Sequence, residues 1–188
     1  MMNRFVQIIL AVTIATMVTG CSNPNSQSNN SSKKTAAVKA EQPINWKQAS
    51  QDKPYPTISQ NNGRYIQVSL EKQRVYIMSP KHRVLYTMYA STGKNHSTPR
   101  GTYHIQQERG NFFYNQQSKE GAHYWTSWKD HGIYLFHTVP TNAKGHYIVS
   151  EADRLGKTAN SHGCIRLAVP DAKWINHTVP AGTKVVVK

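Results

Sequence analysis

Short segments of alternating side chains, separated by turn residues, constrain the fold of this chain most. Apolar and polar residues alternate over residues 64–70, and β-branched and aromatic residues recur over 74–78 and 84–89. A period of two is that of a β-strand, and the sequences EKQ (71–73) and SPK (79–81) between these segments are typical of turns. The pattern therefore predicts consecutive strands joined by short turns.

The rest of the chain adds strands and little helix. Glu151–Leu155 is long enough for one helical turn, and a short helix is predicted from Pro170 to about His177, because proline and aspartate favour the first helical positions. No internal repeat is visible. We therefore predict a mostly β fold: a single β-sandwich or barrel-like domain over residues 64–188 with a few short helices. Further strands are predicted at 102–106, 132–139 and 183–187, and turns at 91–94 and 98–101.

The N-terminus has the pattern of an export signal. A weakly basic start precedes a mostly apolar stretch over residues 5–18, which is shorter than the roughly 20 residues of a spanning helix. Val18-Thr19-Gly20-Cys21 resembles the lipobox of bacterial lipoproteins, which implies that Cys21 carries lipid and begins the mature protein. The alternative is ordinary secretory cleavage near Gly20, with Cys21 incidental. We predict a signal peptide over residues 1–20.

A polar segment follows the signal. Residues 22–32 contain only serine, asparagine, glutamine and proline, and the polar character persists to about Lys53 with one isolated tryptophan, Trp46. Such a composition buries too little apolar surface to order itself. We predict a lipid-anchored flexible linker over residues 21–63, an exported protein held at the outer face of the cell membrane, and action in the cell wall.

Charge and cysteine content narrow the partners. The 188-residue chain has a formal net charge of +14, which favours polyanionic surroundings such as nucleic acid, anionic lipid or an acidic wall. Export favours the wall over nucleic acid, and we expect a monomer. If Cys21 carries lipid, Cys164 has no disulfide partner. A lone thiol outside the cell risks oxidation, so its presence indicates chemistry rather than packing.

The sequence around that thiol, SHGCIRL at residues 161–167, has the groups that activate a cysteine. In an extended segment His162, Cys164 and Arg166 share one side, so the arginine can lower the thiol pKa. Gly163 permits close backbone approach, and the adjacent amides can converge on an oxyanion. A buried structural cysteine is the alternative.

A general base must come from elsewhere in the chain. His137 ends the apolar strand that begins at Gly132, where a side chain can emerge beside a loop, and it is the preferred candidate. His131, on the polar side of the same glycine, is the alternative.

These residues carry a family resemblance. The SHGCIRL sequence, preceded by a histidine on an apolar strand, resembles the signature of the L,D-transpeptidases, cysteine enzymes of bacterial peptidoglycan. The upstream sequences STG (91–93) and TPRG (98–101) are similar to turns of that family. The resemblance covers roughly residues 64–188.

The resemblance implies a role for each matching residue. Cys164 is the nucleophile, His137 is its base, and the main-chain carbonyl of Thr138 orients the imidazole. The oxyanion pocket is implied to comprise His162, Gly163 and the Cys164 amide. Ser161 and Arg166 are implied to position substrate and to support the loop. Because 25 residues separate His137 from His162, longer than in many members, residues 139–160 are interpreted as an inserted loop.

The implied reaction is a two-step acyl transfer. Cys164 attacks the carbonyl of the third residue of a peptidoglycan stem peptide and expels the terminal D-alanine, which leaves a thioester. An amine of a neighbouring stem then takes the acyl group; if water takes it, the activity is that of an L,D-carboxypeptidase. This chemistry requires no metal and no organic cofactor.

Two further interpretations stay open at this point. Thiolate and imidazole are good zinc ligands, so Cys164, His162 and His137 are also a candidate metal site. A wall-binding module without catalysis is the second. Six aromatic residues are either core or the lining of a groove or lid over the thiol: Phe112, Phe113, Tyr114, Tyr124, Trp125 and Trp128.

Overall fold

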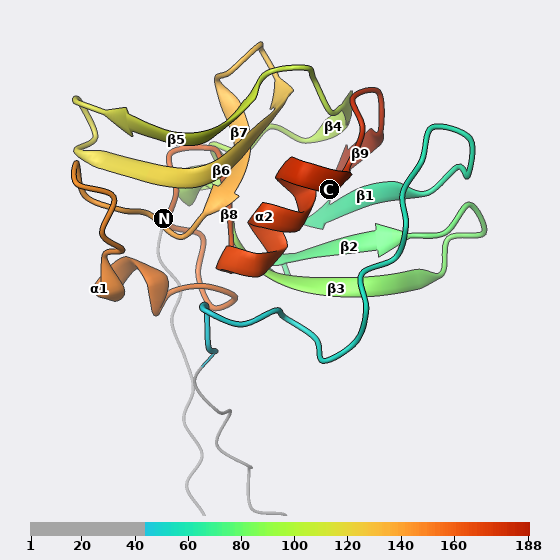
Figure 1. The fold of residues 1–188 in the computed structure, drawn as a ribbon, viewed down its shortest axis with the longest axis horizontal. Helices are drawn as coiled ribbons and strands as arrows, with labels where there is room; N and C mark the ends of the chain where they lie inside the picture. Colours follow the sequence, from blue (N-terminus) through green and yellow to red (C-terminus); the bar gives the residue numbers. More distant parts are fainter. Residues whose placement is uncertain (1–43) are drawn as a thin grey trace, which may run out of the picture. The chain divides into compact units, whose positions relative to one another are not determined.

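Nine strands form one continuous sheet in the part of the chain that the structure, a computed structural model, describes: residues 44–188 (Figure 1). The strand order is β4-β9-β1-β2-β3-β8-β7-β6-β5. The strands are β1 Tyr65–Ser69, β2 Arg74–Met78, β3 Val84–Ser91, β4 Gly101–His104, β5 Arg109–Asn115, β6 Glu120–Lys129, β7 Tyr134–Thr138, β8 Ile165–Leu167 and β9 Lys184–Val187. The mostly β fold class is confirmed.

Helical structure is limited, as predicted, to short elements. The described residues contain α1 Val149–Ala152, α2 Val169–Thr178 and a 3-10 turn, η1, at Lys94–His96. The helix predicted from Pro170 is α2, and the proline lies in its first turn. None of the described helices is long and apolar enough to cross a membrane.

The core explains why the sheet curls around α2. Alternate residues of the central strands, such as Ile66, Val75 and Met88, are fully buried. They form one cluster with Ile165 on β8 and Ile175 on α2, the helix that packs across β6, β7 and β8 (Figure 1). Burial of such a face is the main favourable term in folding.

Three strands lie where the sequence predicted none. The β5–β6 hairpin spans the aromatic-rich region that was interpreted as a groove, a lid or core, and β8 is only three residues long. Apolar and polar residues do not alternate in β5–β6, because β5 is an edge strand whose residues are half-buried or exposed, whereas Ala122 and Trp128 on β6 are buried. Tertiary packing therefore determines these strands rather than a local pattern.

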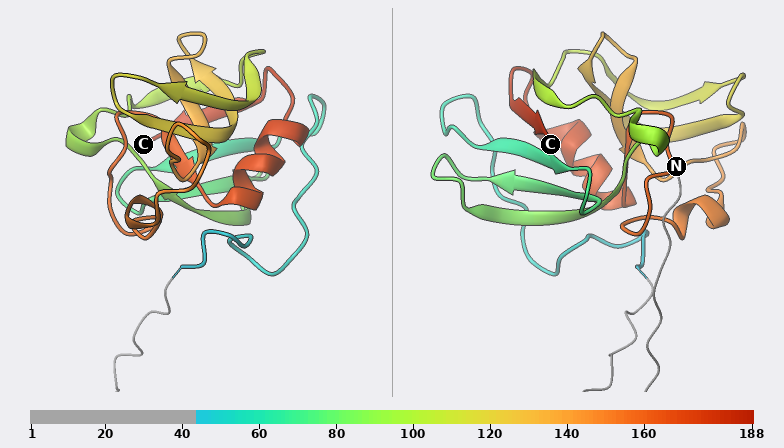
Figure 2. Two further views of the ribbon diagram at one scale, coloured as in Figure 1. Left: turned by 60° about the vertical axis from the view of Figure 1, so that its left-hand side comes forward. Right: turned by 180° about the vertical axis from the view of Figure 1, so that it is seen from behind.

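The folded unit begins before Arg64, where the domain was predicted to start. Trp46 is buried in a second apolar cluster with Val139, Ala152 and Leu155. Tyr55 stacks on Trp174 of α2 with ring centroids 5.0 Å apart. Figure 2 shows this segment running around the outside of the folded unit before it enters β1. Residues 44–63, predicted as linker, thus pack on the domain.

A buried carboxylate fixes the same segment. Asp171 on α2 is fully buried and accepts hydrogen bonds from the hydroxyl groups of Ser50 and, at 2.7 Å, Tyr55. Burial raises the pKa of Asp171, and the bonds from Ser50 and Tyr55 oppose that rise. The predicted signal peptide, Cys21 and the linker up to residue 43 lie outside the described residues.

Candidate active site

A pocket of about 420 Å³ lies where the β5–β6 hairpin faces the end of β7 and the loop before β8. This volume suits a small ligand or part of a peptide. Its lining residues are Phe113, Asn115, Ser118, Glu120, Gly121 and Trp125 from the hairpin, Gly132, Ile133, Tyr134, Leu135, His137 and Pro140 from β7 and its flanks, and Ser161, His162, Gly163, Cys164 and Arg166 from the loop and β8.

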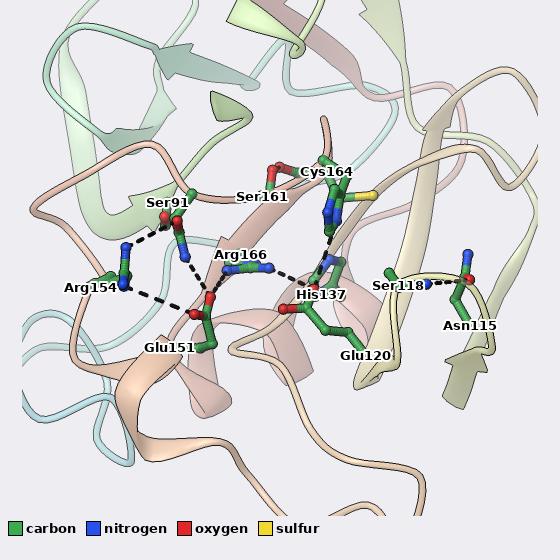
Figure 3. Close-up of polar contacts among 12 residues, drawn as sticks. Ser91, Asn115, Ser118, Glu120, His137, Glu151, Arg154, Ser161, Cys164 and Arg166 are labelled. Carbon is green, nitrogen blue, oxygen red and sulfur yellow. Dashed lines mark hydrogen bonds and ion pairs between the residues drawn. The ribbon is translucent and has the colours of Figure 1, made fainter. Parts of the chain in front are cut away.

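Strand pairing brings the predicted nucleophile and base together. β7 and β8 are parallel neighbours, and His137 is paired in register with Arg166. Cys164 lies two residues before Arg166, in the bend that leads into β8, and both residues line the pocket. His137, on β7, and Cys164, in the loop that leads into β8, therefore line the same pocket, and Figure 3 shows both residues with Arg166 nearby.

The imidazole of His137 is held in one orientation. It is 6% exposed, and its Nδ1 lies 2.6 Å from the main-chain oxygen of Thr138. A carbonyl oxygen can only accept a hydrogen bond, so Nδ1 carries the proton and Nε2 is left with its lone pair. This is the contact that the family resemblance implied for Thr138, and it leaves a basic nitrogen available.

Burial makes the imidazole a neutral base. Burial in the first place, and then the positive charge of Arg166, lower the pKa of His137 to about 4, while the hydrogen bond to Thr138 opposes the change. At neutral pH the side chain is therefore uncharged and can accept a proton.

The surroundings of Cys164 favour the neutral thiol. Its Sγ lies 3.5 Å from the main-chain oxygen of Ile133, which can accept the thiol proton in a hydrogen bond. Burial raises the pKa of Cys164 to about 11; the Leu135 amide and Arg166 lower it, and Glu120 adds to the rise. The expected effect of Arg166 is present, but burial outweighs it. A neutral thiol beside a neutral imidazole calls for proton transfer during attack.

The loop around the cysteine is closed by its own serine. Ser161 is 2% exposed, and its Oγ donates to the Cys164 carbonyl at 2.5 Å and accepts from the Gly163 amide at 3.1 Å. Ser161 was expected to position substrate and to support the loop, and its hydroxyl is placed for the second role. The Gly163 amide, expected at an oxyanion, is already used. His162 is exposed at the pocket.

Arg166 is buried between two carboxylates. Its Nη1 lies 2.7 Å from Glu151 on α1, and its Nη2 lies 2.7 Å from Glu120 at the start of β6 (Figure 3). The arginine side chain is 2% exposed. A guanidinium with both ends engaged joins the hairpin, β8 and residues 139–160 into one unit. Like Ser161, Arg166 is placed for support.

Glu120 and Glu151 were missed in the sequence. Glu120 also lies 3.8 Å from Nδ1 of His162, and Glu151 accepts from Asn160. A buried arginine requires an acidic partner, and the described chain is poor in acidic residues, but only the fold shows which carboxylates reach it.

His131, the alternative base, lies apart from the pocket. Its side chain is 75% exposed, and its Nδ1 lies 2.7 Å from Glu108. It is absent from the residues that line the cavity. The geometry favours His137.

The six aromatic residues divide between pocket and packing. Phe113 and Trp125 line the cavity, and Phe113 meets the ring of His137 edge-on at 5.7 Å. Trp128 is buried in the core, whereas Phe112 is exposed on the other side of β5. The proposed lining thus applies to two of the six, and Tyr114 and Tyr124 are not among the lining residues.

Within residues 44–188, no group of three or more histidine, cysteine, aspartate or glutamate side chains is arranged to hold a metal ion. Cys164, His162 and His137 do not form such a group. Cys164 and His137 instead place a thiol and an oriented imidazole in one cavity with aromatic and polar walls.

Comparisons with known proteins identify the family. The family model for the L,D-transpeptidase catalytic domain (YkuD) matches residues 63–187. A protein of Bacillus subtilis (strain 168) named "Putative L,D-transpeptidase YciB" is 43% identical over 148 residues, which cover 77% of this chain and 74% of that protein. The chain belongs to the L,D-transpeptidase family and is an enzyme of that class.

Solved structures show the same fold at lower identity. An L,D-transpeptidase from Mycobacterium tuberculosis H37Rv is 22% identical, with a TM-score of 0.53. The match covers 67% of this chain and 57% of that chain. LdtMt1, solved in complex with imipenem, is also 22% identical, with a TM-score of 0.54 and coverage of 67% and 59%. The chain thus spans less than two thirds of these longer proteins.

Proposed function

We propose that Cys164 is the nucleophile and His137 the general base of a peptidoglycan L,D-transpeptidase. The observation that carries this proposal is the oriented, neutral imidazole of His137 in one pocket with the thiol of Cys164. A non-catalytic wall-binding module gives no reason for this pair.

The first half-reaction forms a thioester. Nε2 of His137 takes the thiol proton while Sγ attacks the carbonyl carbon of the third stem residue. The bond from that carbon to the nitrogen of the terminal D-alanine breaks, and the imidazolium returns the proton to the departing amine. Because burial disfavours charge on both partners, proton transfer coincides with attack rather than preceding it.

The second half-reaction transfers the acyl group. The amine nitrogen of a neighbouring stem attacks the thioester carbon and loses a proton to His137. The C–S bond then breaks, and the imidazolium returns the proton to Sγ, which regenerates the thiol. With water in place of the amine, the same steps give L,D-carboxypeptidase activity. The aromatic residues Phe113 and Trp125 on the pocket wall favour transfer, because apolar walls limit access of water.

An oxyanion forms in each half-reaction. The main-chain amide of Cys164 is the donor best placed to stabilise it, because the amide of Gly163 is bonded to Ser161. His162, exposed at the pocket beside Glu120, is a second candidate donor.

The experiment is intact-mass measurement after incubation with a carbapenem. Imipenem is the ligand in the solved LdtMt1 complex, and its β-lactam carbonyl is an acyl donor for a thiol. We expect wild-type protein to gain the mass of one imipenem and Cys164→Ala to gain none. A folded, reduced wild-type protein that stays unmodified contradicts the proposal. If the purified protein instead holds zinc in a stoichiometric amount and needs it for activity, the metal-site alternative is favoured.

We further propose that residues 1–20 direct export, that Cys21 carries the lipid, and that a monomer works at the outer face of the membrane. The support is the sequence from Val18 to Cys21 and the peptidoglycan chemistry of the family. Cys21→Ala should move the protein from the membrane fraction to the soluble fraction after cell lysis, and light scattering should give the mass of one chain. Unchanged membrane association contradicts the anchor.

A further inference from the structure

A threonine beneath the cysteine loop has a contact that the proposed chemistry does not yet use. Thr98 is 2% exposed and follows η1. Its Oγ1 accepts the amide proton of Gly93 at 2.7 Å and donates to the carbonyl of Gly163 at 2.9 Å. One buried hydroxyl thus joins the loop after β3 to the peptide bond that precedes Cys164.

Because that peptide bond is planar, this contact also fixes the direction of the Cys164 N–H. In a planar trans peptide, the C=O and the following N–H point in opposite directions. The Gly163 carbonyl points to Thr98, which lies outside the pocket lining, whereas Gly163 and Cys164 both line the pocket. The amide N–H of Cys164 must therefore point away from Thr98, to the side on which the thiol and the pocket lie.

The remaining contacts of the loop make the Cys164 amide the available donor. The Gly163 amide is bonded to Ser161. Among the hydrogen bonds within residues 44–188, none uses the amide of Cys164. An unengaged amide beside the nucleophile is what an oxyanion needs.

Gly163 needs such a restraint. Its φ of +139° is a conformation that residues with side chains rarely adopt, and glycine has more alternative backbone states than any other residue. A Cβ at this position would lie 3.0 Å from the ring of Tyr134 and 3.1 Å from the Ser97 carbonyl. The bond from Thr98 to the Gly163 carbonyl therefore selects one of the peptide orientations that glycine permits, in addition to the bonds of Ser161 on either side.

The loop that carries Thr98 is itself rigid. Gly93 pairs with Ser161, and the Lys94 amide donates to the Ser161 carbonyl at 3.0 Å. A Cβ on Gly93 would lie 2.3 Å from Ser97 Oγ, so this turn has no room for a side chain. The backbone that carries Thr98 is thus held in place.

We propose that Thr98 is a positioning residue, which holds the Gly163–Cys164 peptide so that the Cys164 amide faces the oxyanion of the acyl-transfer intermediate. It touches neither substrate nor the reacting atoms and acts through Gly163. This inference rests on the proposed function, since it presumes that Cys164 is acylated.

The test compares two reactions of the same thiol in the full chain. Acylation by imipenem forms the S–C bond, breaks the lactam C–N bond with proton transfer to that nitrogen, and passes through an oxyanion. Alkylation by iodoacetamide displaces iodide at a saturated carbon and forms no oxyanion. The ratio of the two rates, measured by intact mass at one pH, therefore reports oxyanion stabilisation separately from access to the thiol.

Thr98→Val keeps the shape but removes the hydroxyl, and Thr98→Ser keeps the hydroxyl. We expect Thr98→Val to slow acylation about 10- to 100-fold, which is less than the cost of about 100- to 1000-fold for removing an oxyanion donor, because the Cys164 amide is misplaced rather than lost. Alkylation should stay within about twofold of wild type. Thr98→Ser should restore acylation. Thr102→Val, at an exposed position on β4, is the matched control and should change neither rate.

Three results would overturn the inference. The first is a Thr98→Val protein that is acylated at the wild-type rate. The second is a Thr98→Val protein that keeps the wild-type melting temperature but loses acylation and alkylation equally. The third is a Thr98→Ser protein that is acylated as slowly as Thr98→Val. If the valine variant does not fold, a folded Thr98→Ser protein that is acylated at least about tenfold more slowly than wild type, with unchanged alkylation, overturns the inference, because it keeps the hydroxyl. Failure of the wild-type protein to acylate would instead contradict the proposed function.

Discussion

His137 donates its Nδ1 proton to the carbonyl of the next residue, Thr138, at 2.6 Å. The bond joins neighbours in sequence, yet it decides which ring nitrogen faces the pocket. A histidine with the other tautomer would present an N–H to Cys164 and could not take the thiol proton. The end of β7 therefore orients the proposed base through its own main chain.

This relationship predicts the effect of removing each histidine. His137→Ala should lower the rate of imipenem acylation about 100-fold or more, the usual contribution of a positioned base. His131→Ala should leave the rate unchanged, because His131 is exposed and paired with Glu108. Single-turnover acylation followed by mass spectrometry measures both. The opposite pattern would assign the base to His131.

The protonation states predict how reactivity depends on pH. With the pKa of Cys164 raised to about 11, alkylation by iodoacetamide should rise about tenfold per pH unit between about pH 6 and 9, as the thiolate fraction grows. With the pKa of His137 lowered to about 4, the imidazole stays neutral down to about pH 5, so His137 should remain able to act as the base for imipenem acylation over that range. An alkylation rate that is flat from pH 5 upward would indicate a preformed thiolate–imidazolium pair.

Much of the fold, and the meeting of Cys164 and His137 in one pocket, was predictable from sequence, and the reasons are local. The strands at 65–69, 74–78 and 84–91 alternate over a two-residue period, and SHGC with a strand-ending histidine is a specific signature. The β5–β6 hairpin was missed because its half-buried or exposed edge strand and its buried partner do not alternate.

The contacts that hold the site in place were less predictable, because they join residues far apart in the chain. Glu120 and Glu151 are 46 and 15 residues from Arg166, and no local pattern identifies them. The placement of Trp46 and Tyr55 on the domain was missed for the same reason. Isolated aromatics in a polar segment become informative only when the surface that buries them is known.

The carboxylates around Arg166 predict a large loss of stability on truncation. Arg166→Ala leaves Glu120 and Glu151 facing each other without a counter-charge, and breaking a buried ion pair typically costs about 3–5 kcal/mol. Urea denaturation measures the free energy of unfolding. The control is Arg154→Ala, an exposed arginine 3.9 Å from Glu151, which should cost less than about 1 kcal/mol. Equal losses in the two variants would show that Arg166 is not the structural centre of the cluster.

The contact between Asp171 and the segment before β1 predicts that residues 44–63 contribute to domain stability. Asp171→Ala removes the acceptor for the hydroxyl groups of Ser50 and Tyr55, and an unsatisfied buried donor costs about 1–3 kcal/mol. The free energy of unfolding should fall by that amount, and the amides of residues 45–55 should exchange faster with solvent, because the segment is released from α2. Asp153→Ala, at an exposed position after α1, is the control and should leave both unchanged. Unchanged exchange in Asp171→Ala would mean that Trp46 and the stacking of Tyr55 on Trp174 hold the segment by themselves.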